Sequence, residues 1–256
     1  MIEMIKILNH LSKKFPKKIA KKYHDHVGLM TGKMPGKVQK IFLCLDLDWE
    51  VLPNIIKEKP DVIITHHPFI FGTKASVFKW DLSKKELCEK IDEMGIPVYS
   101  FHTNFDEGNG GMNDALTQAL GLKDIYANPK DPMMRIGYLD KEMDVKEFAE
   151  FAKKTFDVSY GLLVNAGNQK VKKVGIIGGG GSRSYPKAID EECDIYISGD
   201  VPHYVRRDVI NRKFNYLDFP HEIEKIFMPT MKNILLSIDD TLDIVTIDHE
   251  KLPTVI

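Results

Sequence analysis

The chain has 256 residues, of which 43% are hydrophobic and 29% are charged, which is typical of a soluble globular protein and excludes the disordered and fibrous classes. Its length exceeds the usual domain of about 100 to 200 residues, so we expect one large domain or two lobes. The 36 basic and 37 acidic residues nearly cancel, which removes the overall positive field that would attract nucleic acid or an anionic membrane.

Membrane, export and disulfide patterns are all missing from the sequence. No apolar run approaches the roughly 18 to 20 residues that cross a bilayer, and the first residues contain no signal-peptide cleavage site. The three cysteines, Cys44, Cys88 and Cys193, lie far apart without a CxxC pair, so we read them as core residues. We therefore expect a cytoplasmic protein that contacts no membrane, and we do not expect a nucleic-acid partner.

The first elements in chain order are a helix and a turn-rich connection. Apolar residues at helical spacing predict a helix over residues 5–15, and glycine and proline mark residues 27–36 as a connection. Lysines between residues 13 and 22 alternate with apolar residues, which favours a solvated helix face and leaves a local basic patch as the alternative.

Short apolar runs then alternate with helical patterns, which is the signature of βαβ units and predicts a largely parallel sheet. The predicted strands cover residues 41–45, 62–64 and 97–100, and the predicted helices cover 51–57, 84–94 and 112–120. The second half repeats this order, with strands at 171–177, 194–197 and 214–217 and helices at 188–192 and 201–212.

The two halves also share sequence. DVIITHHP at residue 61 matches DIYISGDVP at residue 194, and KIFLC at residue 40 matches KVGII at residue 173, so both matches are offset by 133 residues. Equal offsets predict an α/β fold of two interleaved βαβ-type lobes from an internal duplication. The lobes would cover residues 1–128 and 129–256, with the final segment packed back on the first lobe. A shared fold unit without a joint site would also produce such a repeat.

Two adjacent histidines follow directly on the buried-strand pattern of residues 61–64. Ligand sites of such sheets gather at the carboxyl ends of strands, but neighbouring strand residues point in opposite directions. His66 and His67 can therefore address one site only where the chain turns, and Pro68 biases His67 toward an extended or turn conformation. A lone histidine is more often structural, whereas this pair is equally a candidate for metal binding.

Two carboxylates and a third imidazole complete the candidate ligand set. Asp106 follows His102 in a predicted loop, so it can point inward or cap the helix that starts near residue 112. His221 and Glu224 open the last predicted helix at spacing i and i+3, which places both on one face. Position 225 is lysine, so the HExxH pattern of one-zinc proteases is not formed.

The composition of this set predicts the kind and number of ions. Three imidazoles and two carboxylates without a thiolate suit a divalent ion such as Zn, Fe, Mn or Co. Five ligands overfill one tetrahedral zinc, which predicts two ions per subunit about 3.5 to 4 Å apart, bridged by Asp106 or Glu224. Since His66, His67 and Asp106 come from the first lobe and His221 and Glu224 from the second, we expect the metal site in the cleft between them.

A glycine-rich segment, residues 178–181, lies between a predicted strand and a helical segment. It could present Gly179, Gly180 and Ser182 to an anion of the substrate, or it could only form a tight turn. The lysine of a P-loop and the acidic residue of a Rossmann fingerprint are both missing. Asp200 and His203 occupy the repeat position of His66 and His67, which makes them candidates for substrate binding or for supporting the ligands.

Together these motifs resemble the Ngg-interacting-factor-three-like family of dinuclear-metal proteins, the GTP cyclohydrolase I type 2 homologues. The resemblance spans nearly the whole chain and rests on HVGL at residue 26, THHPFIF at 65, HTNFD at 102, GMN at 111, IGGGG at 177, SGDVPH at 198 and HEIE at 221. It implies two metal ions per subunit on the residues matching His66, His67, Asp106, His221 and Glu224, with His102 close by, and a toroidal homohexamer. Members often carry asparagine at the position of His26, and some contain an inserted domain that 256 residues cannot accommodate.

Two functions follow from these features. The first is a metal-dependent hydrolase of a nucleotide or related phosphorylated small molecule, with a metal-activated water as nucleophile and His102 as catalytic acid/base or supporting partner. The alternative is a non-enzymatic hexamer that carries or senses metal, or binds a partner, through the same ligands. Turnover that is abolished by chelation would favour the enzyme.

Overall fold

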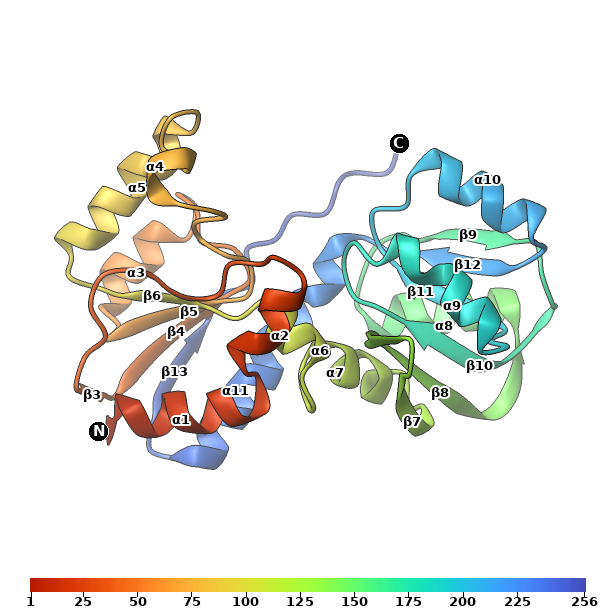
Figure 1. Ribbon diagram of the computed structural model, residues 1–256, viewed down its shortest axis with the longest axis horizontal. Helices are drawn as coiled ribbons and strands as arrows, with labels where there is room; N and C mark the ends of the chain where they lie inside the picture. Colours follow the sequence, from red (N-terminus) through yellow and green to blue (C-terminus); the bar gives the residue numbers. More distant parts are fainter. The chain divides into compact units, whose positions relative to one another are not determined.

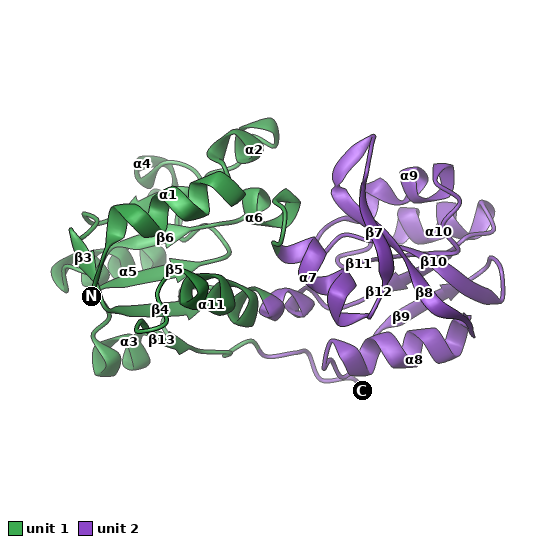
Figure 2. Ribbon diagram, turned by 90° about the horizontal axis from the view of Figure 1, so that it is seen from below, with its two compact units in different colours: residues 1–111, 227–250 green, residues 112–226, 251–256 purple.

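The chain folds into two compact units (Figure 1), and the computed structural model describes all residues from 1 to 256. Figure 2 colours the first unit, Met1–Gly111 with Phe227–Glu250, green and the second unit, Met112–Ile226 with Lys251–Ile256, purple. The division after Gly111 differs from the expected boundary at residue 128. It lies earlier because the helix that begins at Met112 packs against strands of the second unit.

The first unit is built on a five-stranded sheet. The strands of the whole unit are β1 (Ile2–Glu3), β2 (Gly28–Thr31), β3 (Lys37–Val38), β4 (Lys40–Cys44), β5 (Val62–Thr65), β6 (Val98–Ser100) and β13 (Asp243–Thr246). Its helices are α1 (Met4–Lys14), α2 (Lys17–Lys22), α3 (Leu52–Glu58), α4 (Lys74–Val77), α5 (Leu82–Glu93), α6 (Thr103–Glu107) and α11 (Phe227–Ile238). The sheet order is β13-β4-β5-β6-β2, with only β2 antiparallel, and β1 and β3 form a separate antiparallel pair.

The core of the first unit explains why β5 reads as a continuous apolar run. All four residues of β5 are fully buried, as expected for a parallel strand that is covered on both faces. Ile55 of α3 and Leu87 and Ile91 of α5 pack in one cluster with Ile63 of β5. Each such apolar side chain contributes about 1.5 to 3 kcal/mol when buried. This packing holds the carboxyl ends of β5 and β6 in place.

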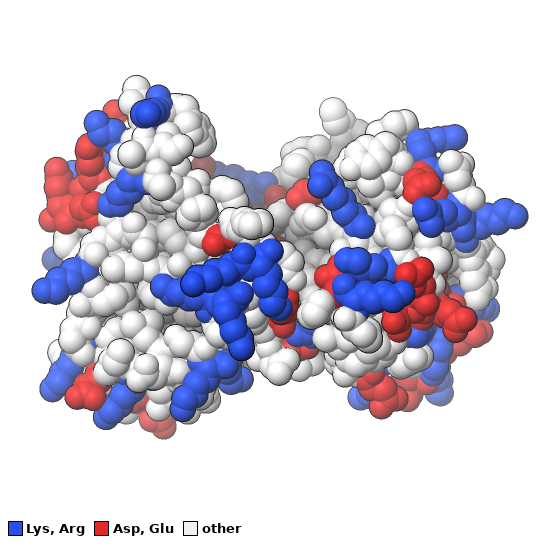
Figure 3. Space-filling view, viewed as in Figure 1, with Lys and Arg blue, Asp and Glu red and all other residues white.

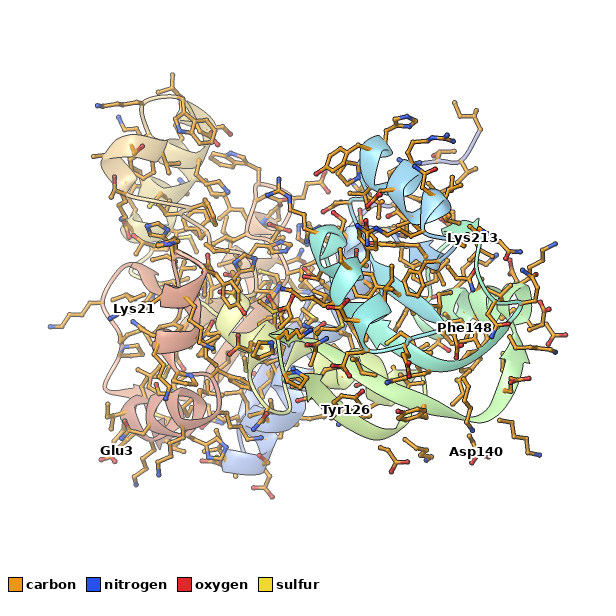
Figure 4. The ribbon with its side chains drawn as sticks, turned by 45° about the vertical axis from the view of Figure 1, so that its right-hand side comes forward. Glu3, Lys21, Tyr126, Asp140, Phe148 and Lys213 are labelled. Atoms are coloured by element: carbon orange, nitrogen blue, oxygen red, sulfur yellow. The ribbon has the colours of Figure 1, made fainter.

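The second unit is built on a six-stranded sheet. Its strands are β7 (Lys123–Asn128), β8 (Asp131–Asp144), β9 (Leu162–Asn165), β10 (Lys170–Ile176), β11 (Ile195–Ser198) and β12 (Asn215–Asp218). Its helices are α7 (Met112–Ala119), α8 (Val145–Thr155), α9 (Tyr185–Asp190) and α10 (His203–Asn211), with 3-10 helices η1 (Ser182–Ser184) and η2 (His221–Ile226). The order is β7-β8-β10-β11-β12-β9. The Asp144 side chain caps α8, whose Phe148, labelled in Figure 4, is fully buried.

The paired strands of the two units share one register. Ile41 of β4 pairs with Val62 of β5, and Val174 of β10 pairs with Ile195 of β11, which is the same pairing shifted by 133 residues. The backbone N–H groups of residues 39 and 40 donate to the carboxylate of Asp61, and those of 172 and 173 donate likewise to Asp194. The α/β fold class is confirmed, and duplication as its origin stays a prediction.

Two expectations about the strands are wrong. Residues 27–36 contain β2, an antiparallel edge strand beside β6 that begins with Gly28 and is followed by Gly32, with φ of 105° and 75°. A largely parallel sheet describes the first unit only. In the second unit β7, β8 and β9 pair antiparallel, because the long β8 crosses beside β10 and β9 closes the opposite edge.

The structure bears on two further expectations. Cys44, Cys88 and Cys193 are all buried and free, which confirms that they are core residues. None of the helices combines the length and apolar composition that spanning a bilayer requires.

Candidate metal centre

His66 and His67 lie where the chain leaves β5. Both backbone N–H groups donate to the carbonyl of Leu45, at 3.2 and 3.1 Å, so the chain turns there as the sequence predicts. Nδ1 of His66 lies 2.8 Å from the carbonyl oxygen of Phe101, and Nδ1 of His67 lies 2.7 Å from Oδ2 of Asp46. Since each Nδ1 faces an oxygen acceptor, that nitrogen carries the proton, and Nε2 is the ring nitrogen that could bind a metal ion.

His102 follows β6 and is held by a buried aspartate. Its Nδ1 lies 2.8 Å from Oδ2 of Asp25, which also accepts from the backbone N–H and the hydroxyl of Thr103 at 3.2 and 2.6 Å. Burial raises the pKa of Asp25, but the hydrogen bonds from His102 and Thr103 outweigh burial and lower the pKa to about 2. Asp25 is therefore an anion at neutral pH and fixes the His102 ring.

The three imidazoles of the first unit converge on one place. One ring nitrogen from each of His66, His67 and His102 lies within 4.8 Å of the others. The ring centroid of His66 is 4.9 Å from that of His67 and 5.2 Å from that of His102. A group of three imidazoles at these separations could hold a metal ion, whose bonds to nitrogen are about 2.0 to 2.1 Å long. His102 therefore lies beside the predicted ligands, as the resemblance implies.

Asp106 lies on the short helix α6, and the prediction of a loop at this position is wrong. The carbonyl of His102 accepts the N–H of Asp106 at 3.0 Å, which closes the single helical turn. Oδ1 of Asp106 lies 3.5 Å from Nε2 of His66, and Asp106 is only 8% exposed. This position favours the interpretation of Asp106 as a ligand over that of a helix cap.

His221 and Glu224 of the second unit lie on η2. Side chains three residues apart eclipse in a 3-10 helix, and Nε2 of His221 lies 3.0 Å from Oε2 of Glu224, as their spacing predicts. Nδ1 of His221 lies 2.6 Å from Oδ2 of Asp200. Glu224 is 4% exposed. Each unit therefore contains a histidine whose Nδ1 is held by an oxygen acceptor and whose Nε2 lies beside a carboxylate.

The glycine-rich turn packs closely against Glu224. A Cβ atom on Gly179 would lie 2.3 Å from Oε1 of Glu224, and the φ of Gly179 is 59°, in the left-handed region. The N–H of Gly178 already donates to Oδ1 of Asn113 on α7, at 2.7 Å. The segment that follows Gly181 is the three-residue η1. These contacts explain the glycines as a turn that leaves room for Glu224, and binding of an anion here stays a prediction.

The remaining candidates for substrate binding lie on different segments of the second unit. Ser182 is buried at the start of η1, and His203 is exposed at the first residue of α10. Asp200 is the residue that holds His221, so its contact supports the ligand-supporting role.

Gly179→Ala is expected to weaken metal binding and to lower the melting temperature. The added methyl group would meet the Glu224 carboxylate, and the left-handed backbone alone costs roughly 1 kcal/mol for a residue with a Cβ. Gly180→Ala is the matched control, because its Cβ would lie 3.7 Å from the nearest atom, Oδ2 of Asp200. Metal content and thermal unfolding measure both effects. Equal behaviour of the two variants would refute the packing argument.

A cavity of about 380 Å³ lies beside His221 in the second unit. Its walls include Tyr160, Arg206 and Asp218. Burial raises the pKa of Asp218 to about 6, and the positive charge of Arg206 only partly offsets this effect. The cavity therefore places a guanidinium and a carboxyl group that titrates near neutrality next to a candidate ligand.

Asp218→Asn is expected to raise the free energy of unfolding of the metal-free protein by about 1 kcal/mol at pH 8, after discounting for its partial exposure. The pKa is about 6 in the folded state and ordinarily 3.8, so the folded state binds more protons and loses stability as pH rises through this range. The neutral asparagine avoids that loss. Urea denaturation at pH 8 and pH 4 checks the prediction, since the gain should disappear toward pH 4; a gain of the same size at both values would argue against it.

Asp25 and Asp46 are the residues of the candidate site that the sequence analysis missed. Asp46 follows the end of β4, so the strand-end criterion that singled out His66 could also have found it. Asp25 lies between α2 and β2, and its partner His102 is 77 residues away in the sequence. No local pattern indicates that pairing.

The candidate ligands are imidazoles and carboxylates, without thiolates, and the imidazoles are held by hydrogen bonds at Nδ1. The molecule is therefore an α/β protein with candidate sites for divalent cations. A family model described as Duf34/NIF3 (NGG1p interacting factor 3) matches residues 2–253, and the chain belongs to this family. The resemblance seen in the sequence motifs is thereby confirmed.

Curated relatives and solved structures agree with this assignment. The GTP cyclohydrolase 1 type 2 homolog of Lactococcus lactis subsp. lactis is 29% identical over 219 residues, covering 84% of each chain. The protein of the same name from Clostridium perfringens is 30% identical over 203 residues, covering 77% of each chain. The crystal structure of a hypothetical protein from Staphylococcus aureus has a TM-score of 0.89 at 22% identity and covers 99% of both chains, which shows the shared fold.

Proposed function

We propose that His66, His67 and Asp106 of the first unit and His221 and Glu224 of the second together hold two divalent metal ions per chain. The observation that carries this proposal is the orientation of His66 and His221. Each has Nδ1 held by an oxygen acceptor and Nε2 within 3.5 and 3.0 Å, respectively, of a carboxylate oxygen. Such outer partners are typical of metal-binding histidines, and the donor set suits Zn, Fe, Mn or Co.

The proposed activity is metal-dependent hydrolysis of a nucleotide or a related phosphorylated small molecule. The ions, when bound, supply Lewis-acid chemistry. The Asp25 anion holds Nδ1 of His102, so Nε2 is the atom at which His102 takes or gives a proton during the reaction. The name of the two bacterial relatives, GTP cyclohydrolase 1 type 2 homolog, supports a nucleotide as the substrate class.

Elemental analysis of anaerobically purified protein, followed by a screen of nucleotides with each candidate metal, tests both parts. We expect two ions per chain and turnover that chelation abolishes and metal restores. One ion per chain would refute the two-metal site. Two tightly bound ions without turnover on any nucleotide would refute the hydrolase and support the metal-carrying alternative.

We further propose that the chain assembles into a homohexamer, as the resemblance implies, and that it acts in the cytoplasm. Mass photometry should then detect a particle of six times the chain mass of 29.2 kDa. A particle of one chain mass at micromolar concentration would refute the assembly.

A further inference from the structure

A second candidate binding site lies in the first unit, beside the histidine that we place in catalysis. It is a cavity of about 370 Å³ whose polar walls are Lys17, Lys21, Asp25, His26 and Lys74, and we refer to it as the lysine pocket. Its apolar walls include Leu29, Met30 and Ile70. Pockets of this size and mixed lining accommodate small organic ligands. Asp25 joins the lysine pocket to the metal centre, because the same carboxylate holds His102.

The lysine pocket owes its shape to a glycine. Gly28 has a φ of 105°, which side chains with a Cβ rarely adopt, and a Cβ there would lie 2.3 Å from Nζ of Lys17. The missing side chain lets the Lys17 ammonium reach across β2, where it lies 5.6 Å from the ring centroid of Tyr99. Lys17 is therefore guided into the lysine pocket by the fold.

The charges of the lysine pocket leave Lys17 and Lys21 available to a ligand. The Lys74 ammonium already contacts Oδ2 of Asp92 at 3.1 Å, and Asp25 is engaged with His102 and Thr103. Lys17 and Lys21 form no ion pair within the chain. Figure 3 shows basic side chains gathered over α2, whose lysines are Lys17, Lys18, Lys21 and Lys22, and Figure 4 labels Lys21. The local field at the lysine pocket therefore favours an anion.

An aromatic surface borders the lysine pocket. The ring centroid of His26, which lines the lysine pocket, lies 5.9 Å from that of Phe71. Phe71 is 63% exposed although its neighbours Phe69 and Ile70 are each 2% exposed. A pocket lined by two lysines and by a histidine that contacts an exposed aromatic ring matches a ligand with a planar ring at one end and a phosphate at the other. Rings stack on aromatic side chains, and phosphates accept from ammonium groups.

We propose that the lysine pocket binds a nucleotide, with its phosphate on Lys17 and Lys21 and its base against His26 and Phe71. The identification of this ligand as the substrate rests on the proposed hydrolase function. Binding itself does not, because none of these residues is a candidate metal ligand.

Binding of GMP and of inorganic pyrophosphate to the metal-free, EDTA-treated full chain tests the proposal by isothermal titration calorimetry. Lys17→Gln and Lys21→Gln should each weaken both probes by about threefold to tenfold, the range expected when one exposed charge-assisted contact is lost. Lys18→Gln is the matched control, since it removes the same charge from α2 outside the lysine pocket. It should leave both affinities unchanged. Phe71→Ala should weaken GMP and leave pyrophosphate unchanged.

The outcomes separate this proposal from the metal chemistry. Absence of GMP and pyrophosphate binding in the wild type, or equal losses in Lys17→Gln and Lys18→Gln, would overturn the lysine pocket, even if metal-dependent turnover were found. Equal losses of both probes in Phe71→Ala would overturn the placement of the base. Binding with the expected pattern but no turnover would support the lysine pocket and overturn the hydrolase alone. Thermal unfolding of each variant verifies that these exposed substitutions leave the fold intact.

Discussion

His66→Ala is expected to weaken metal binding by at least about 100-fold, since loss of a mere supporting partner already costs about 10- to 100-fold. The imidazole supplies Nε2, which lies 3.5 Å from Asp106, and nothing in an alanine side chain can replace it. His10→Ala is the control, because His10 lies on α1 and is not among the candidate ligands. Metal titration followed by elemental analysis of the dialysed protein measures the difference.

A second variant distinguishes the loss of a metal ligand from the loss of a residue that only holds a ligand in place. Asp46→Asn retains every proposed ligand and removes the anion that lies 2.7 Å from Nδ1 of His67, so it should weaken binding by about tenfold. Circular dichroism of the metal-free variants checks that His66, which is fully buried, can be truncated without unfolding. Unchanged metal content in folded His66→Ala would exclude His66 as a ligand.

Asp114→Ala is expected to lower the free energy of unfolding by about 3 kcal/mol, the low end of the cost of breaking a buried ion pair. Arg135 of β8 is 2% exposed, and its Nε donates to Oδ1 of Asp114 on α7 at 2.5 Å. The alanine leaves the guanidinium buried without this carboxylate. Urea denaturation at pH 7 measures the loss.

Asp190→Ala provides the matched control for Asp114→Ala. Asp190 lies 3.2 Å from Lys130, but the two side chains are 55% and 67% exposed, so its loss should cost less than about 1 kcal/mol. Similar losses in the two variants would show that the Arg135 pair contributes no more than a surface pair. If only Asp114→Ala loses stability, we also expect the side chain of the neighbouring Asn113 to change position. Asn113 accepts the hydrogen bond from Gly178 that holds the glycine-rich turn.

The parallel strands β4, β5, β6, β10, β11 and β12 could be predicted because burial produces apolar runs that stand out in the sequence, whereas the parallel strand β13 was not predicted. The antiparallel strands could not be predicted. β8 contains Pro132, Arg135 and Lys141 and has a mixed burial pattern, so its strand character comes from pairing with β7 and β10 and not from local propensity. β2 spans only four residues, beginning with Gly28 and followed by Gly32, and both glycines also fit a turn.

The residues of the candidate site could be predicted where they directly follow the ends of predicted strands. His66, His67 and the i, i+3 pair His221 and Glu224 are visible from position and spacing. The helix of Asp106 was not, because the five residues of α6 form little more than one turn and show no periodicity. The anchoring of His102 by Asp25 depends on tertiary contacts across 77 residues, which a single sequence does not encode locally.

The first unit is discontinuous, and this has a consequence for synthesis on the ribosome. Strand β4 is paired on one side by β13, whose residues Asp243–Thr246 are translated after the whole main segment of the second unit. Ile41, Phe42, Leu43 and Cys44 are fully buried in the finished protein. In a nascent chain that ends before β13, one hydrogen-bonding edge of this apolar strand is open to pair with a neighbouring polypeptide. The second unit can thus complete its sheet first, and a chain interrupted before β13 exposes an aggregation-prone edge of β4.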